Sequence, residues 1–276
     1  MKKLLTKDFN LDHTLSCGQV FRWHRHEARL PSHTAQAVGG QGYWYGFIGR
    51  KPVKVRQEGN DLLFDGKVTA KAVKDYFNLD LDYIKVIKTF PNSRILILAL
   101  KKYWGLRIIK QEPFECLVSY ILSSQNNIKR INGMVNELSF RFGKKMTFEG
   151  REVNAFPTLK ELSGCCRNDL RSCRLGFRDR FLEDAIKRLC SKELKLEKIA
   201  KMPYTKAMND LMKVKGIGKK VANCILLFGY NKYEAFPVDV WIERIIRKYF
   251  PGKDATYFGK YAGYAQEYLY AFARNL

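Results

Sequence analysis

The sequence lacks most of the features that mark membrane, secreted and metal-binding proteins. It has no uncharged apolar run long enough to span a bilayer, and residues 1–5 are followed at once by Thr6, Lys7 and Asp8, which leaves no apolar core for a signal peptide. The seven cysteines are odd in number and include no Cys-x-x-Cys pair and no His-bearing ligand spacing. We therefore expect a cytoplasmic protein with reduced thiols and no structural metal.

Negative charge is also scarce. Asp and Glu total 27 against 50 for Lys and Arg, which gives a formal net charge of +23. This balance favours a polyanionic partner such as nucleic acid, although ribosome-associated and membrane-surface proteins are basic too. Fifteen Tyr and eighteen Phe indicate a packed core rather than a disordered basic tail.

The chain divides into two regions with different periodicity. Up to residue 85, short aromatic and β-branched segments at 43–48, 53–57 and 62–64 alternate with turn signals such as Glu58-Gly59-Asn60-Asp61. Beyond it the apolar spacing becomes helical, and Thr158 with Glu161 forms a capping-box pattern. We expect helices at 92–103, 113–124, 128–142, 179–190, 205–214 and 219–228. These patterns predict an α+β fold, with an N-terminal antiparallel β domain over 1–85 and a mostly α-helical region over 86–276.

Residues 24–42 differ from their surroundings. They hold three of the four histidines (His24, His26 and His33) and no lysine. We interpret the segment as a loop between strands rather than as a metal site.

A helix, a tight turn and a second helix are predicted over 208–228. Residues 208–214 have helical periodicity, Gly216 and Gly218 can take positive φ, and a second apolar-periodic helix starts at Lys219. The free N–H groups and positive dipole end of the second helix would form a site for a phosphate oxygen. The alternative is an ordinary two-helix corner in a lysine-rich protein.

Asp239 follows in the loop 236–240, immediately before a helical pattern that starts at Val240. It is therefore interpreted first as an N-cap, which requires no catalytic role. A capping carboxylate is nonetheless held rigid, which suits a group that must stabilise positive charge.

Seven motifs in one order along the chain resemble the helix-hairpin-helix DNA glycosylases, and among them the 8-oxoguanine DNA glycosylase/AP lyase family, with this chain as a prokaryotic-like member. They are Ser16-Cys17-Gly18-Gln19-Val20-Phe21-Arg22-Trp23, Gln111-Glu112-Pro113-Phe114-Glu115-Cys116, Ser123-Ser124-Gln125-Asn126-Asn127-Ile128-Lys129-Arg130-Ile131, Leu175-Gly176-Phe177-Arg178, the 214–224 hairpin, Pro237-Val238-Asp239 and Tyr264-Ala265-Gln266. The related branch with a four-cysteine iron–sulfur loop is disfavoured, because no cysteine follows Cys224.

The resemblance implies base excision by a lysine nucleophile. Lys220 would attack C1′ of the damaged nucleotide and form a Schiff base that permits β-elimination, while Asp239 would stabilise the oxocarbenium-like sugar. Lys219 is the rival by adjacency. Because neighbouring helical residues point about 100° apart, only one can face a pocket, and the family register selects Lys220.

The resemblance also implies a pocket for a flipped base. Gly18 would accept a hydrogen bond from N7–H, which 8-oxoguanine has and guanine lacks, and Gln266 would read the Watson–Crick edge. Tyr270 and Cys224 would stack on the two sides of the base. The alternatives are that Gly18 only permits a tight turn and that Gln266 and Tyr270 belong to an ordinary amphipathic helix.

A further set of residues would hold the DNA and the orphaned partner base. By resemblance they are Gln125, Asn126, Asn127, Arg130, Phe177 and Arg178, with Gly216 and Gly218 at the phosphate backbone. Two departures put strict preference for cytosine in doubt: Gln125 replaces the first Asn of a triplet, and Trp241 stands where a histidine follows the aspartate. Asn126 and Asn127 also suit an N-cap before Ile128.

The implied function is that of a bifunctional DNA glycosylase/AP lyase that excises 8-oxoguanine from double-stranded DNA in base excision repair. We expect a monomer that is associated with the nucleoid during repair, has no membrane partner and requires no cofactor, with a monovalent cation in the hairpin as the one ion the resemblance allows. The alternatives are an alkylbase or other helix-hairpin-helix glycosylase, against which Lys220 argues, and a non-catalytic helix-hairpin-helix DNA-binding protein.

Overall fold

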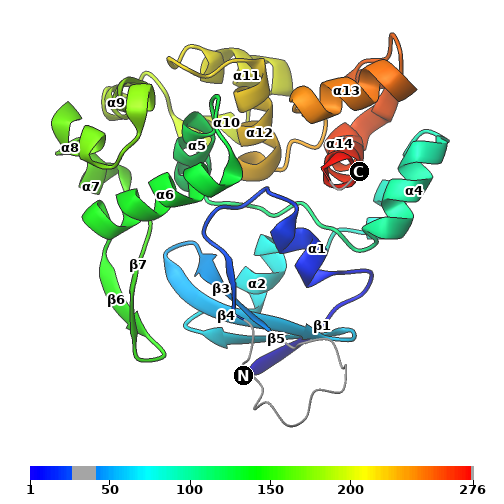
Figure 1. Ribbon diagram of the computed structural model, residues 1–276, viewed down its shortest axis with the longest axis horizontal. Coiled ribbons are helices and arrows are strands. Elements are labelled where there is room, and N and C mark those ends of the chain that lie inside the picture. Colours follow the sequence, from blue (N-terminus) through cyan, green and yellow to red (C-terminus); the bar gives the residue numbers. More distant parts are fainter. Residues whose placement is uncertain (27–41, 275–276) are drawn as a thin grey trace.

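A computed structural model describes residues 1–26 and 42–274 (Figure 1). It confirms the α+β prediction: an antiparallel sheet near the N-terminus is followed by a mostly helical remainder. In Figure 1 the sheet lies below the helices, and the long central and C-terminal helices lie above it. Of the residues 24–42, those from 27 to 41, with His33, lie outside the described residues.

The sheet has five strands within the described part of the chain, in the order β1-β5-β4-β3-β2, and neighbouring strands are antiparallel. The strands are β1 (Lys2–Leu5), β2 (His24–His26), β3 (Tyr43–Ile48), β4 (Lys51–Glu58) and β5 (Asp61–Gly66). The predicted turn is confirmed, since Glu58 pairs with Asp61 and Gly59 takes a φ of +58°. His24 and His26 belong to edge strand β2 and not to a loop, because they pair with Tyr45 and Tyr43.

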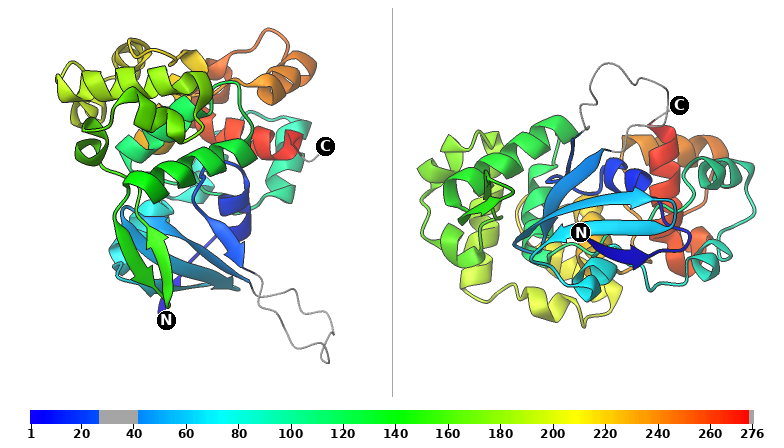
Figure 2. Two further views of the ribbon diagram at one scale, coloured as in Figure 1. Left: turned by 60° about the vertical axis from the view of Figure 1, so that its left-hand side comes forward. Right: turned by 90° about the horizontal axis from the view of Figure 1, so that it is seen from below.

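One face of the sheet is covered by two short helices that the sequence analysis did not predict, α1 (Leu11–Ser16) and α2 (Ala70–Tyr76). Alternate residues of β4 and β5, such as Val53, Val55 and Leu62, are fully buried and pack with these helices in one apolar core. Figure 2 shows the sheet from below, with the helices behind it. Side-chain caps start both helices, from Asn10 and Thr69.

The remaining helices and a second hairpin make up the rest of the chain. The helices are α3 (Tyr83–Ile87), α4 (Arg94–Lys102), α5 (Pro113–Leu122), α6 (Ile128–Phe142), α7 (Leu159–Ser163), α8 (Arg167–Ser172), α9 (Asp179–Cys190), α10 (Leu196–Ile199), α11 (Tyr204–Met212), α12 (Lys219–Tyr230), α13 (Val240–Tyr249) and α14 (Ala262–Ala273), with 3₁₀ segments η1 (Gly176–Arg178) and η2 (Ala255–Tyr261). The six predicted helices are all present, with ends no more than two residues from those predicted. The capping box of Thr158 and Glu161 is also confirmed.

A hairpin of β6 (Lys145–Phe148) and β7 (Arg151–Asn154) interrupts the helical part and was not predicted. Glu149 in its turn accepts a hydrogen bond from Tyr45 of the sheet at 3.0 Å. Arg50 in the β3–β4 turn makes a two-pronged contact with Glu161, at 2.8 and 3.0 Å. The β region is thus tied to the helices, and the domain division at residue 85 stays a prediction.

Candidate active site

A cavity of about 660 Å³ lies between the hairpin that joins α11 to α12, the helices α13 and α14, the segment before α6 (residues 123–127) and the turn after α1. Eleven of the fourteen predicted site residues line it: Gly18, Gln125, Asn126, Asn127, Gly216, Gly218, Lys220, Cys224, Asp239, Gln266 and Tyr270. Arg130, Phe177 and Arg178 are not among its lining residues. The volume falls within the range of small-molecule sites and is sufficient for a base.

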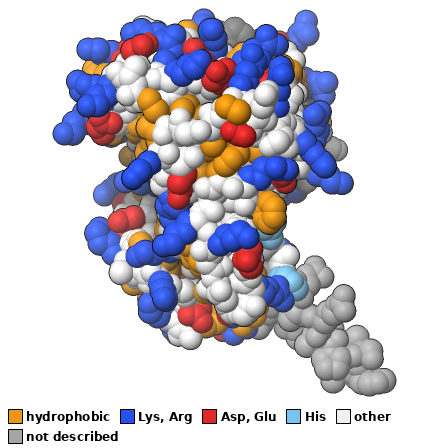
Figure 3. Space-filling view, turned by 90° about the vertical axis from the view of Figure 1, so that its left-hand side faces the viewer, with side chains coloured by type: hydrophobic (Ala, Val, Ile, Leu, Met, Phe, Trp, Pro, Cys, Tyr) orange, Lys and Arg blue, Asp and Glu red, His pale blue; other side chains and the backbone are white. Residues whose placement is uncertain are grey.

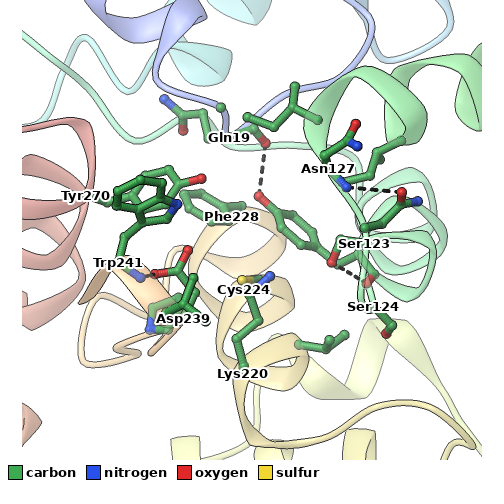
Figure 4. Close-up of a pocket in the computed structure, with 18 of the residues that line it drawn as sticks. Gln19, Ser123, Ser124, Asn127, Lys220, Cys224, Phe228, Asp239, Trp241 and Tyr270 are labelled. Atoms are coloured by element: carbon green, nitrogen blue, oxygen red, sulfur yellow. Dashed lines mark hydrogen bonds between the residues drawn. The ribbon is translucent and has the colours of Figure 1, made fainter. Parts of the chain in front are cut away.

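Lys220 lies in the first turn of α12, and its side chain is half-buried whereas that of Lys219 is exposed. Its ammonium nitrogen is 5.8 Å from the ring centroid of Tyr120. Figure 4 shows Lys220 and Cys224 extending from α12 into the space between Asp239 and Ser123. Burial raises the pKa of the Cys224 thiol to about 11, against the opposing effect of the Lys220 charge, so this thiol is a neutral wall of the cavity.

Asp239 caps α13, as predicted. Its Oδ1 accepts hydrogen bonds from the backbone N–H groups of Trp241 at 3.0 Å and Ile242 at 2.9 Å. Both bonds go to one oxygen, so the cap fixes the carboxylate without using the other. The side chain is half-buried and lines the same cavity as Lys220 (Figure 4).

The two glycines of the hairpin between α11 and α12 have different structural roles. Gly216 has a φ of +82°, and a Cβ there would lie 2.3 Å from the Phe181 ring. Gly218 does not take the positive φ that the sequence allowed: at φ −91° and ψ −178° it is the extended N-cap of α12, and a Cβ would meet open space. Because no side chain within the described ranges caps α12, its first N–H groups can receive a phosphate oxygen.

The turn after α1 brings Gly18 into the cavity at a φ of +101°. A Cβ there would lie 2.8 Å from Arg274 Nη1 and 2.9 Å from Ile128 Cδ1. Arg274 also donates to the Cys17 carbonyl at 3.0 Å, which joins this turn to the end of α14. Glycine is therefore required here both for its conformation and for the close approach of its neighbours.

Gln19 anchors the same turn in the interior. Its Nε2 donates to the carbonyls of Thr14 at 2.9 Å and Arg107 at 2.8 Å, and its Oε1 accepts from the N–H of Ile109 at 2.8 Å. The Gln19 carbonyl in turn accepts from the Tyr120 hydroxyl at 3.1 Å, a bond drawn in Figure 4. The turn is thus held rigidly against both α1 and the chain that enters α5.

Helix α14 supplies Gln266 and Tyr270, and also a residue that the sequence analysis missed. Gln266 is 4% exposed, and its Oε1 is buried without a hydrogen-bond partner among the described residues. The missed residue is Glu267, which lines the cavity and is 2% exposed. The sequence held one signal for it, because Glu267 is the single charged residue within 262–273.

The segment before α6 uses its asparagines locally. Asn127 is the N-cap of α6 and accepts from the N–H of Arg130 at 2.9 Å, as its alternative interpretation predicted. Asn126 accepts from the N–H of Asn127 at 3.0 Å and donates to the Leu122 carbonyl at 3.0 Å. Gln125 precedes them with a φ of +47° and an exposed side chain.

The guanidinium of Arg178 binds the backbone of this segment. Only 3% of it is exposed, and it donates to the carbonyls of Ser124 and Gln125, both at 2.8 Å, and to that of Leu175 at 3.3 Å. Burial, and then the positive charge of Arg130, lower the pKa of Arg178. The base contact that the resemblance implied for Arg178 would require these bonds to be exchanged.

Phe177 and Arg130 lie at the surface nearby. Phe177 is 38% exposed, and the Arg178 guanidinium lies 4.4 Å from the centroid of its ring. The Arg130 side chain is exposed. On the face shown in Figure 3, Lys and Arg side chains predominate over Asp and Glu above and below a central hydrophobic area. Such a surface suits a polyanion.

Residues 1–26 and 42–274 contain no group of three or more His, Cys, Asp and Glu side chains that could hold a metal ion. None of the helices found in these ranges is both long and apolar enough to cross a membrane.

Two family models match consecutive parts of the chain. Residues 3–117 match the 8-oxoguanine DNA glycosylase N-terminal domain, and residues 118–257 match the HhH-GPD superfamily of base excision DNA repair proteins. The boundary between the two matches falls inside α5.

Similar proteins extend over most of the chain. The probable N-glycosylase/DNA lyase of Methanothermobacter thermautotrophicus is 31% identical over 260 residues, which cover 81% of this chain and 83% of that protein. The N-glycosylase/DNA lyase of Saccharomyces cerevisiae is 30% identical over 263 residues, covering 86% and 67%.

The fold is similar to that of solved structures. The crystal structure of the Clostridium acetobutylicum 8-oxoguanine glycosylase/lyase, in complex with double-stranded DNA containing cytosine opposite 8-oxoG, has a TM-score of 0.88 at 31% identity and covers 100% of this chain and 98% of that one. A 3-methyladenine DNA glycosylase from Archaeoglobus fulgidus, at 20% identity and a TM-score of 0.73, shares the fold alone. The chain therefore belongs to the 8-oxoguanine DNA glycosylase family, within the helix-hairpin-helix superfamily of base excision DNA repair proteins.

Proposed function

We propose that this protein is a bifunctional DNA glycosylase/AP lyase that excises 8-oxoguanine from duplex DNA, with Lys220 as its nucleophile. The observation that carries this proposal is the placement of Lys220 and Asp239 in the wall of one base-sized cavity beside a helix-hairpin-helix. The half-burial of Lys220 against the exposure of Lys219 supports the choice between the two lysines.

The reaction starts with the flipped nucleotide in the cavity. The neutral amine of Lys220 bonds to C1′, and the base leaves with the electrons of its glycosidic bond. Asp239, fixed by its cap bonds to α13, stabilises the positive charge that develops on the sugar. Opening of the sugar ring gives a Schiff base, and loss of a C2′ proton then expels the 3′ phosphate by β-elimination.

Recognition of the lesion depends on the turn after α1. The Gly18 carbonyl accepts from N7–H, and the bonds of Gln19 and Arg274 keep that turn from adapting to guanine. A base without this proton would set two acceptors against each other, at a cost of about 1–3 kcal/mol. Gln266 reads the Watson–Crick edge through its Oε1, which has no partner among the described residues, and Tyr270 and Cys224 enclose the base.

The opposite strand is held by the surface around the segment before α6. Gln125, which is exposed, contacts the orphaned base, and Phe177 fills the gap in the stack. Arg130 supplies the guanidinium that favours cytosine. Asn126, Asn127 and Arg178 shape the segment that carries these groups.

The hairpin binds the phosphate backbone through Gly216, Gly218 and the first N–H groups of α12, with a monovalent cation in the hairpin as a further proposed ligand. We also propose that the enzyme acts as a monomer in the cytoplasm, associated with the nucleoid during repair.

Reduction with borohydride tests the proposed function directly. The enzyme is incubated with duplexes that contain 8-oxoguanine, guanine or 3-methyladenine at one position, and the Schiff base is reduced to a stable adduct. We expect an adduct with the 8-oxoguanine duplex and none with the guanine duplex. Release of 3-methyladenine without an adduct would instead identify an alkylbase glycosylase, and binding without any excision would identify a non-catalytic protein.

A further inference from the structure

Glu267 is a buried acidic residue to which the proposed reaction gives no role. It lies on α14 next to Gln266, lines the cavity, and is only 2% exposed. The other residues of 262–273 are uncharged. An acidic residue almost never occupies such a position without a partner.

One oxygen of this carboxyl group lacks a partner. Oε1 of Glu267 is buried and makes no hydrogen bond within the described part of the chain, and Oε1 of the neighbouring Gln266 is in the same state. Leaving a buried polar atom unsatisfied costs about 1–3 kcal/mol. Such atoms in a binding cavity are explained when the ligand supplies the missing partner.

The surroundings of Glu267 favour its neutral form. Burial, and then the negative charge of Asp239, raise its pKa to about 7, although the Cys17 thiol and Arg274 oppose this shift. The other titratable groups near it are those of Tyr120, Cys224 and Tyr270. Burial also raises the pKa of the Cys17 thiol, so this neighbour of Glu267 is neutral, and its S–H donates to the Thr14 carbonyl at 3.3 Å.

We propose that Glu267 is a specificity-determining residue of the base pocket, which as the neutral acid donates a hydrogen bond to a carbonyl oxygen of the flipped base. This inference rests on the proposed function, because it requires a base in the cavity. The proton stays on Glu267 throughout, and no covalent bond is formed or broken in this contact.

The chemistry of the pocket calls for such a donor. The Gly18 carbonyl and the Gln266 Oε1 are acceptors, and the Gln266 amide nitrogen can donate to one carbonyl oxygen; 8-oxoguanine presents two carbonyl oxygens, O6 and O8, so a second donor is needed. A neutral carboxyl group has one O–H to give. If Glu267 loses its proton, it presents only acceptors to a carbonyl oxygen, and it places a second negative charge near Asp239.

The test compares Glu267→Gln, which keeps a donor but cannot titrate, with Glu267→Leu, which has neither donor nor acceptor. Glu234→Gln, on an exposed residue away from the cavity, is the matched control. Single-turnover rates are measured from pH 6 to 9 on a duplex with 8-oxoguanine opposite cytosine and on one with an abasic site, which has no base for Glu267 to contact.

We expect the excision rate of Glu267→Gln, relative to that of the native enzyme, to rise by about tenfold or more between pH 7 and 9, because only the native residue loses its proton. Glu267→Leu should lower excision about 10-fold to 100-fold at pH 6.5. In both variants the lyase rate on the abasic duplex should change by less than about threefold.

Three results would overturn the inference: a constant ratio between Glu267→Gln and the native enzyme across this pH range, undiminished excision by Glu267→Leu, or equal losses on both duplexes, which would indicate a structural role. Failure of the proposed function has a different signature, since the native enzyme would then form no Schiff base on either duplex.

Discussion

The guanidinium of Arg178 donates to the backbone carbonyl of Gln125 at 2.8 Å, and this bond holds Gln125, the residue proposed to contact the orphaned base, in a left-handed conformation with a φ of +47°. Arg178 thereby fixes the backbone position from which the Gln125 side chain extends. The N–H donors of Arg178 are occupied by backbone carbonyls, whereas the Arg130 side chain is exposed.

Replacement of Arg178 should therefore affect excision opposite every partner base. We expect Arg178→Ala to lower single-turnover excision about tenfold or more against each of the four partners, because buried carbonyls lose their donors. The preference for cytosine over adenine should change by less than about threefold. Arg130→Ala is the comparison, and it should lower that preference. Loss of cytosine preference in Arg178→Ala alone would show that Arg178 reads the base itself.

Gln125 should relax the choice of partner base. Its extra methylene and rotatable bond, compared with asparagine, blur a hydrogen-bond geometry that tolerates only small displacements. We expect rates opposite the four bases to span about one order of magnitude, or about 1.4 kcal/mol, and Gln125→Asn to widen that span. A native preference for cytosine over adenine of about a thousandfold, or about 4 kcal/mol, would contradict this.

Substitutions of the two adjacent lysines of α12 should give different results in a trapping experiment. Lys220→Gln should abolish the covalent adduct formed with borohydride on 8-oxoguanine DNA and leave binding of that DNA within about threefold. Lys219→Gln, on an exposed side chain, should keep the adduct and weaken binding. The opposite pattern would place the nucleophile at Lys219.

The two hairpin glycines should respond differently to alanine. Gly216→Ala should destabilise the fold by about 1–3 kcal/mol, since it strains a positive φ and forces the Phe181 ring to move. Gly218→Ala should leave the unfolding free energy within about 0.5 kcal/mol. Both should weaken binding of damaged and undamaged duplex alike, with a steep dependence on salt. Thermal melts and titrations at two salt concentrations measure these effects.

The contact between Arg50 and Glu161 should make stability depend on pH in the acidic range. The hydrogen bonds from Arg50, and then those from Thr158, lower the pKa of Glu161 to about 2. A lowered pKa contributes stability above the unfolded value near 4.5, and that contribution is lost as the pH falls through about 2. Because both side chains are 34% exposed, we expect Glu161→Gln to cost only about 1 kcal/mol at pH 7.

Urea unfolding of the native protein and Glu161→Gln at pH 7 and pH 2.5 measures this contribution. The two proteins should approach each other in stability at the lower pH. An undiminished difference there would assign the effect to the capping box rather than to the charge.

Features set by neighbouring residues could be predicted from the sequence. The capping box at Thr158, the cap at Asp239 and the limits of α6 all depend on side chains within four residues of one another. Motif resemblance supplied other residues of the cavity wall, such as Gly18 and Gln266, which their spacing in the sequence alone would not have brought together.

Features set by distant contacts could not be predicted. Strand β1 exists because Lys2 pairs with Phe64, sixty-two positions along the chain. The two lysines and two leucines of β1 contain no pattern that predicts this pairing. The burial of Glu267 depends on how α14 packs against the Cys17 turn, and the role of Arg178 depends on the carbonyls of a loop more than fifty residues earlier.

The bond from Arg274 to the Cys17 carbonyl spans 257 positions of the sequence. The turn that holds Gly18 comes first in this interval, Lys220 and Asp239 come about two hundred positions later, and α14 completes the cavity wall last. Contacts of such long range slow folding, because closing so long a loop costs entropy before the contact forms. A chain cut before α14 would keep Lys220 and Asp239 but would lack the cavity wall that Gln266, Glu267 and Tyr270 supply.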